Sequence, residues 1–131
     1  MSGDDLGTHP YGFIGITGDL LTFEDVWTFL DGVPLRLDQE TRSRIQHNRL
    51  DLEHHALHHP VYGVSRGFGQ HQDIEVSPEK QRLLQTNLIV SHAVSFGPPA
   101  SPDLARLALL FRLNALVKGY SGFVLNSSNI F

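Results

Sequence analysis

The residues with the clearest chemical potential lie in Pro60–Gln70, PVYGVSRGFGQ. Tyr62 carries a phenol, which can donate or accept a proton, and Gly63, Gly67 and Gly69 follow it. Glycine is used where a backbone turns sharply or approaches another group closely. The glycine spacing matches neither the dinucleotide fingerprint nor the phosphate-binding loop. The connection is nevertheless long for a simple turn between two helices, and such loops are usually functional.

Four histidines form two pairs with i, i+4 spacing, His54 with His58 and His55 with His59. This spacing on a helix can clamp a metal ion, but metal sites normally need a third ligand and supporting outer hydrogen bonds. No further histidine or carboxylate is evidently aimed at the same place. We therefore expect no metal site, and interpret the histidines as a solvated polar face whose positive charge suits a helix C-terminus.

Ser91 and His92 form another candidate pair, within NLIVSHAV. A lone histidine in an apolar helix is more often a hydrogen-bonded core residue than a catalyst, and a single tyrosine such as Tyr62 is most often part of a core. Neither residue identifies a function on its own.

The elements that must position these side chains are predicted to be mainly α-helical. Helix start and stop signals, such as a hydroxyl cap followed by proline and an acid, occur repeatedly. The predicted elements are a short strand within 12–18, a helix from Thr22 to Gly32 with a Thr22–Asp25 capping box, a strand or link at 33–37, a helix capped by Asp38 and stopped by Pro60, a helix from Ser77 to about Gly97, and a helix opened by Ser101-Pro102-Asp103.

The last predicted helix is apolar nearly all round. One face carries Leu104, Leu107, Ala108, Phe111 and Ala115, and much of the rest carries Leu109, Leu110, Leu113, Leu116 and Val117. Such a helix is expected to be buried on all sides. Three companion helices can hardly surround it, so we expect the chain to be part of a longer polypeptide or an oligomer.

Composition narrows the class of protein. The 131 residues suit one domain, and the net charge of −4 disfavours nucleic acid as a partner. The chain has no cysteine, which excludes disulfides, thiolate catalysis and Cys-based zinc sites. The acidic N-terminus lacks the apolar core of a secretory signal, and the longest apolar run is too short for a membrane span. A cytoplasmic protein without membrane contact is expected.

Three segments in this order and spacing resemble the N-terminal part of the aromatic amino acid ammonia-lyases. They are PVYGVSRGFG, LLQTNLIVSHAVSFG and LFRLNALVKGYSG, and the earlier LLTFEDVWTFLDG and VPLRLDQETRSRI also fit. The resemblance covers residues 16–122. It predicts a flexible leader at 1–15, a lyase segment at 16–122 and a divergent tail at 123–131, FVLNSSNIF. The tail favours a truncation, a frameshift or a gene fragment.

The resemblance implies a helical fold, a homotetramer about four times this length, and elimination of ammonia from an aromatic amino acid. It implies that Tyr62 is the base or proton relay, on a loop with Gly63, Gly67, Phe68 and Gly69. It also implies that His92, with Ser91, lies at the side-chain end of the substrate. The Ser-His pair favours histidine as the substrate, with some tyrosine-acting relatives and the aminomutases left open.

This role gives the glycines around Tyr62 a physical purpose. Tyrosine has an ordinary pKa of about 10, so about one phenol in a thousand is ionised at neutral pH. Hydrogen-bond donors or positive charge must therefore stabilise the phenolate. Closely approaching backbone N–H groups can do so, and Arg66 is a second candidate, although an exposed arginine is the commoner case.

The sequence also departs from the family pattern. Ser65 and Arg66 replace the usual Asn-Thr or Thr-Thr, which puts the loop's hydrogen bonding in doubt. The family's electrophile, methylidene-imidazolone, forms from Ala-Ser-Gly, which this sequence lacks; in Ala100-Ser101-Pro102, proline replaces the glycine that must attack. We therefore expect no cofactor in this chain and no activity alone, with remaining lyase segments or a second copy as partners. The alternative is a degenerate, non-catalytic remnant that acts as a helical interaction module.

Overall fold

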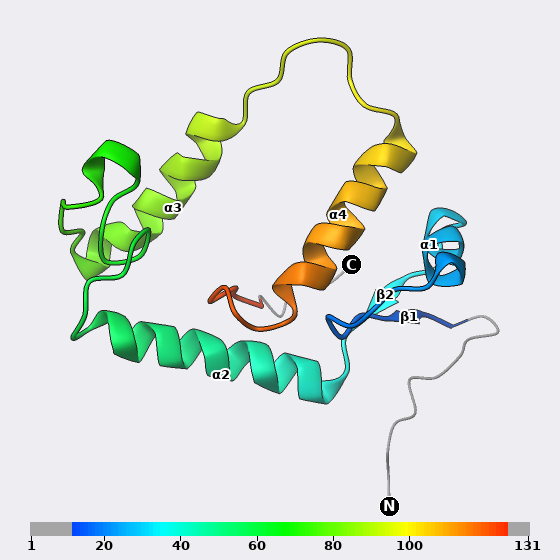
Figure 1. Ribbon diagram of the computed structural model, residues 1–131, viewed down its shortest axis with the longest axis horizontal. Helices are drawn as coiled ribbons and strands as arrows, with labels where there is room; N and C mark the ends of the chain where they lie inside the picture. The colour runs from blue at the N-terminus through cyan, green and yellow to red at the C-terminus, as the bar shows by residue number, and fades with distance from the viewer. Residues whose placement is uncertain (1–11, 126–131) are drawn as a thin grey trace, which may run out of the picture. The chain divides into compact units, whose positions relative to one another are not determined.

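The structure is a computed structural model that describes residues 12–125. Residues 1–11 of the expected leader and 126–131 of the expected tail lie outside the described residues. The chain forms two compact units, which we name unit 1 (up to Leu50, and from Ala100 onward) and unit 2 (Asp51–Pro99). The fold is mainly helical, as predicted (Figure 1). Its elements are β1 (Ile14–Gly15), α1 (Phe23–Leu30), β2 (Leu35–Arg36), α2 (Gln39–Ala56), the 3₁₀ turn η1 (Gly69–His71), α3 (Pro78–His92) and α4 (Pro102–Leu116).

Unit 1 begins with local structure that the sequence predicted. The Thr22 hydroxyl accepts a hydrogen bond from the backbone N–H of Asp25, whose carboxylate accepts from the Thr22 N–H, so the capping box is confirmed. Gly32 follows α1 with φ +99°, the left-handed conformation expected of a C′ glycine. The chain then returns as β2, which pairs in parallel with β1 (Ile14 opposite Leu35).

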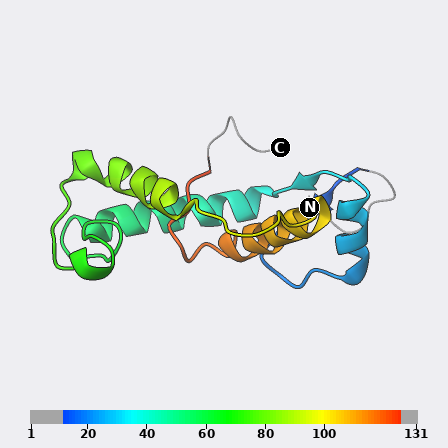
Figure 2. The same ribbon diagram turned by 90° about the horizontal axis from the view of Figure 1, so that it is seen from above.

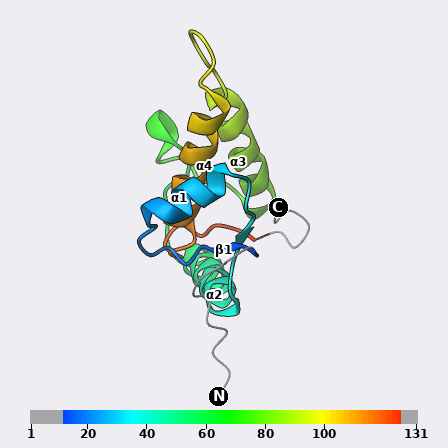
Figure 3. The same ribbon diagram turned by 90° about the vertical axis from the view of Figure 1, so that its right-hand side faces the viewer.

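The core of unit 1 lies where β1, β2, α2 and α4 meet. Its fully buried apolar residues are Ile14, Ile16, Leu37, Ile45, Leu110 and Val117. Figure 3 shows α1 lying across α4, a contact that two hydrogen bonds secure: the Arg106 guanidinium donates to the carbonyls of Phe29 (2.6 Å) and Leu30 (2.8 Å). The Arg44 guanidinium similarly donates to the Thr17 and Val117 carbonyls, which joins three segments distant in sequence.

The start of α2 depends on a carboxylate cap. One Asp38 oxygen accepts from the backbone N–H of Thr41 at 2.6 Å, as the sequence predicted for this cap. The hydrogen bonds from the Thr41 backbone and hydroxyl lower the pKa of Asp38 below its ordinary value of 3.8, and Arg44 adds a smaller effect in the same direction. The ionised form is therefore the one that the fold favours.

Asp38→Ala is expected to lower the free energy of unfolding by about 1 kcal/mol at pH 7, because α2 loses its cap. A depressed pKa stabilises the fold above the ordinary carboxyl range, and this contribution is lost as the pH falls through the folded value. Asp38→Asn, which keeps an acceptor but does not titrate, should therefore lose less stability than the wild type between pH 5 and 2. Urea denaturation of the three proteins across that range measures the effect; parallel pH profiles for wild type and Asp38→Asn would contradict it.

Unit 2 contains the end of α2, the glycine-rich loop and α3. Both helices end earlier than predicted: α2 stops at Ala56 rather than at His59, and α3 stops at His92 rather than near Gly97. The residue before a proline disfavours the α conformation, so the backbone turns before Pro60. After α3, Ala93 leaves the helix with ψ 56°. These ends place His92 in the last turn of α3 rather than in mid-helix.

Candidate active-site loop

The loop from Pro60 to Val76 is folded by its own hydrogen bonds. The Val61 carbonyl accepts from the N–H groups of three successive residues, Val64, Ser65 and Arg66. Further along, Gly67 donates to Ile74, and Val76 donates to Ser65 (2.9 Å). Figure 2 shows the loop, in green, between the end of α2 and the beginning of α3. The loop therefore has a defined backbone conformation that can present side chains.

Ser65 and Arg66, the two residues that depart from the family pattern, make some of the hydrogen bonds that hold the loop. The Ser65 hydroxyl accepts from the Val61 N–H at 2.9 Å and lies 3.4 Å from the His59 carbonyl, to which it donates. The Arg66 guanidinium donates to the Asp73 carbonyl at 3.0 Å. The loop is therefore hydrogen-bonded despite the two substitutions, because the Ser65 and Arg66 side chains themselves bind loop backbone and the His59 carbonyl.

Two of the glycines are required by close approach. Gly63 has φ +71°, and a Cβ there would lie 2.5 Å from the ring of Phe68. A Cβ at Gly67 would overlap the carbonyl oxygen of His71. Both glycines are buried, so a side chain at either position would push the loop open.

Tyr62 lies at the outer face of this loop. Its hydroxyl oxygen accepts a hydrogen bond from the backbone N–H of Gly69 at 3.1 Å, and its ring stands edge-on to Phe68 with centroids 5.5 Å apart. The side chain is 61% exposed, so the usual expectation of a core tyrosine is wrong here. A backbone donor on the phenol oxygen is what stabilisation of negative charge requires. Arg66 is engaged at Asp73 instead.

Ser91 and His92 are held at the C-terminal end of α3. The Leu88 carbonyl, which can only accept, faces Nδ1 of His92 at 2.9 Å and the Ser91 hydroxyl at 3.0 Å. The Ser91 hydroxyl also lies 3.0 Å from Nδ1. In the tautomer that donates from Nδ1 to the Leu88 carbonyl, Nε2 is the acceptor of the ring. The ring is exposed, which differs from the core histidine that a single-residue interpretation favours.

The helix α3 connects the loop and His92, because it binds the loop through Gln85 and carries His92 as its last residue. The side-chain amide of Gln85 donates to the Gly63 carbonyl at 2.5 Å, which attaches the loop to α3. His92 lies about two turns, or roughly 10 Å, further along the same face of α3. Tyr62 and His92 thus belong to one compact unit, and Gln85 links the Tyr62 loop to the helix that carries His92. Sequence reasoning missed Gln85, although its heptad spacing from His92 was visible.

The histidine pairs directly precede the loop in the chain and are exposed. The rings of His55 and His59 stack with centroids 4.4 Å apart, and those of His54 and His58 meet edge-on at 5.6 Å. Among residues 12–125, no three His, Cys, Asp or Glu side chains gather closely enough to hold a metal ion. His58 and His59 line a hollow of about 180 Å³ together with residues of the loop.

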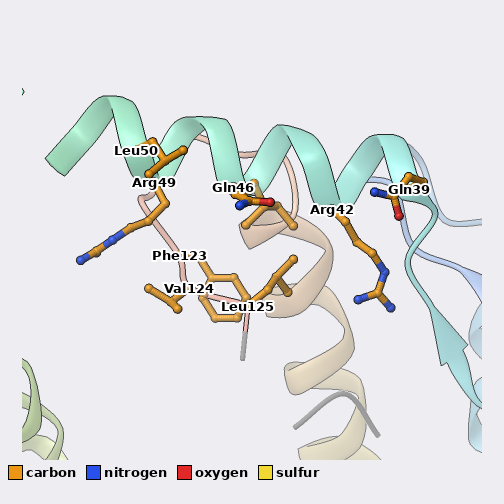
Figure 4. Close-up of a pocket in the computed structure, with 9 residues that line it drawn as sticks. Gln39, Arg42, Gln46, Arg49, Leu50, Phe123, Val124 and Leu125 are labelled. Carbon is orange, nitrogen blue, oxygen red and sulfur yellow. The ribbon is translucent and has the colours of Figure 1, made fainter. Parts of the chain in front are cut away.

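A larger hollow of about 360 Å³ lies in unit 1, beneath α2 (Figure 4). Phe123, Val124 and Leu125 lie between the side chains of Arg42 and Arg49. Both guanidiniums bind backbone, since Arg42 donates to the Leu37 carbonyl and Arg49 to the Gly122 carbonyl, each at 3.2 Å. Sequence reasoning did not predict this hollow, and none of the candidate site residues lines it.

Both units leave large apolar side chains uncovered. In Asp51–Pro99, which is described throughout, only Gly63 and Gly67 are buried. The exposed apolar residues of α3 and the segment after it are Leu83, Ile89, Val90, Val94 and Phe96. In α4 Leu110 is buried, but Leu104, Leu109 and Phe111 are more than half exposed. The rest of the described chain does not cover α4 on all sides, as the sequence analysis predicted. No helix in the described part of the chain has the length and apolarity needed to cross a membrane.

Comparison with known proteins points to one family. The family profile described as aromatic amino acid lyase matches residues 21–128. A histidine ammonia-lyase of Caenorhabditis elegans is 45% identical over 115 residues, which is 86% of this chain and 17% of that protein. A histidine ammonia-lyase of Streptococcus gordonii is 39% identical over 116 residues, covering 87% of this chain and 23% of that protein.

Solved structures agree in fold. Tyrosine aminomutase from Streptomyces globisporus matches with a TM-score of 0.77 and 33% identity, over 85% of this chain and 22% of that one. Ergothionase from Treponema denticola matches with a TM-score of 0.78 and 29% identity, over 83% of this chain and 22% of that one. The chain spans about a fifth of the length of these relatives. It belongs to the aromatic amino acid lyase family.

Proposed function

We propose that this chain supplies the base and the side-chain contact of an ammonia-lyase site that residues from outside the chain complete. Tyr62 takes the proton, and His92 with Ser91 contacts the aromatic end of an amino acid, with histidine favoured as the substrate. The observation that carries the proposal is the hydrogen bond from the Gly69 N–H to the Tyr62 hydroxyl oxygen. The histidine ammonia-lyases among the relatives support the choice of substrate.

The reaction sets what each group must do. Elimination removes a proton from the β-carbon and the amino group from the α-carbon, which leaves a carbon–carbon double bond and ammonia. The Tyr62 oxygen, as phenolate, accepts the β-proton, and the Gly69 N–H stabilises its negative charge before that transfer. The exposed Nε2 of His92 can bind a ring N–H of the substrate, since Nδ1 is held at Leu88.

The family's electrophile does not fit this chain. Methylidene-imidazolone forms from Ala-Ser-Gly, and the chain offers only Ala100-Ser101-Pro102. When present, that group activates the amino group for departure. It would come from residues outside this sequence, either the remaining lyase segments or a second lyase copy. Association through the exposed apolar faces of α3 and α4 would bring it to the site.

A chimera tests the proposal. Residues 21–122 replace the matching segment of the histidine ammonia-lyase of Caenorhabditis elegans, and urocanate formation from histidine is measured by ultraviolet absorbance. We expect activity from the chimera and none from this chain alone. Turnover by the chain alone would overturn the need for an external electrophile. A chimera that folds and assembles like its parent but forms no urocanate would overturn the proposed roles.

The second candidate function is a non-catalytic helical module that associates with a lyase. It is favoured by unit 2, whose apolar side chains are all at least partly exposed. It predicts that the purified chain binds an apolar-surface dye and elutes as an oligomer or as a complex with an added lyase. Light scattering measures this; a monomer that binds no dye would count against the module and against an apolar docking face in the first proposal.

A further inference from the structure

We propose that Gln85 is a positioning residue, whose side-chain amide fixes the Tyr62 loop on α3 and so sets the distance between Tyr62 and His92. This inference rests on the proposed function for its catalytic meaning. Its structural part does not depend on that function. It says that one hydrogen bond from Gln85 holds the loop in place, and it follows from the contacts of unit 2.

The bond reaches the residue next to the base. Nε2 of Gln85 donates to the carbonyl oxygen of Gly63, and Gly63 directly follows Tyr62. Within the described residues, the loop's other hydrogen bonds close inside the loop or onto His59. The attachment of the loop to α3 by hydrogen bonding therefore depends on this one side chain.

Position 63 requires glycine while its carbonyl meets Gln85. Its φ is +71°, and the ring of Phe68 occupies the space that a side chain would need. The same Phe68 ring meets Tyr62 edge-on. A shift of the Gly63 carbonyl would therefore move Tyr62, Phe68 and the Gly69 donor together.

The same helix holds the other end of the site. The Leu88 carbonyl of α3 binds Nδ1 of His92, and Gln85 and His92 lie on one face of α3, two turns apart. A helix is stiff over this length, so α3 acts as a fixed spacer between the two groups. A misplacement of about 1 Å at such a site can cost on the order of a hundredfold in rate.

The chemistry of the bond makes the inference testable. The Gly63 carbonyl is only an acceptor, so position 85 must donate. Methionine has a similar length and no donor, glutamate at neutral pH is only an acceptor and would repel the carbonyl, and lysine is longer but retains a donor. Loop attachment should therefore decrease in the order glutamine, lysine, methionine, glutamate, an order that volume does not predict.

The experiment is amide hydrogen exchange by NMR on the full chain, with Gln85→Met, Gln85→Glu and Gln85→Lys. The amides of Gly69 and Val76 should exchange about three- to tenfold faster in the methionine variant, because one hydrogen bond is lost, and faster still in the glutamate variant. The ring resonances of Tyr62 should move toward those of a free tyrosine as the ring leaves Phe68. The control Gln81→Met, one turn earlier on α3, should leave both readouts unchanged.

Three outcomes decide the matter. The inference is supported if lysine restores the protection that methionine loses, while Ile16 in unit 1 exchanges as in the wild type. It is overturned if Gln85→Met protects the loop as well as glutamine does, or if lysine is no better than methionine. Because no turnover is measured, an inactive chimera with normal loop protection would refute the proposed function and leave this inference intact.

Discussion

Tyr62→Phe in the chimera is expected to reduce urocanate formation about a thousandfold, within the range that a general base contributes. Phenylalanine keeps the ring and its edge-on contact with Phe68 but removes the oxygen that accepts the proton. The Gly69 N–H, which donates to that oxygen, then faces solvent. The effect should fall on kcat, since the substrate's contacts at His92 are unchanged.

Tyr120→Phe is the matched control, because Tyr120 is 88% exposed and lies in unit 1. Steady-state kinetics of both variants, with circular dichroism to confirm folding, should show loss only for Tyr62. If Tyr62→Phe retains more than a tenth of the wild-type kcat, Tyr62 is not the base. The family membership would stand, and the proton acceptor would have to be sought outside this chain.

Leu110→Ala is expected to lower the free energy of unfolding by about 3 kcal/mol, within the 2–5 kcal/mol typical of a buried leucine. Leu110 is 1% exposed and packs in the core of unit 1 with Ile16, Ile45 and Val117. Its removal loses apolar burial and leaves a cavity where α4 meets the strands and α2. Within residues 12–125 few other side chains are buried, so the loss is a large fraction of a small domain's stability.

Leu109→Ala tests whether the loss of stability depends on burial of the leucine or only on the change from leucine to alanine. Leu109 precedes Leu110 on α4 but is 69% exposed, and alanine is a good helix former. Its replacement should change the free energy of unfolding by about 0.5 kcal/mol or less. Urea denaturation of both variants measures the difference. Equal losses would mean that an association of chains covers Leu109, or that α4 packs on its other face.

The beginnings of the helices were predictable because their signals act within one turn. Thr22 closes a capping box with Asp25, and the Ser101 hydroxyl accepts from the N–H of Leu104 at 3.3 Å. The ends were less predictable. No local signal marks Ala56 or His92 as a last residue, since Pro60 and Pro98 lie several residues further on.

The candidate site also has a part that could be predicted from sequence and a part that could not. The resemblance to the lyases indicated Tyr62, His92 and the glycines from sequence, and their roles stay predictions. The donors could not be assigned in advance. Which N–H reaches the Tyr62 oxygen, and where Arg66 binds, depend on how the loop closes on itself.

The sequence by itself determined the family, the helical composition, the caps that begin the helices and the absence of an Ala-Ser-Gly electrophile. These follow from residue identity and from interactions between neighbours along the chain. The tertiary structure decided that Leu110 rather than Leu109 is buried, and that Gln85 binds the Gly63 carbonyl. Burial and such contacts join segments far apart in sequence, so they exist only once packing has brought those segments together.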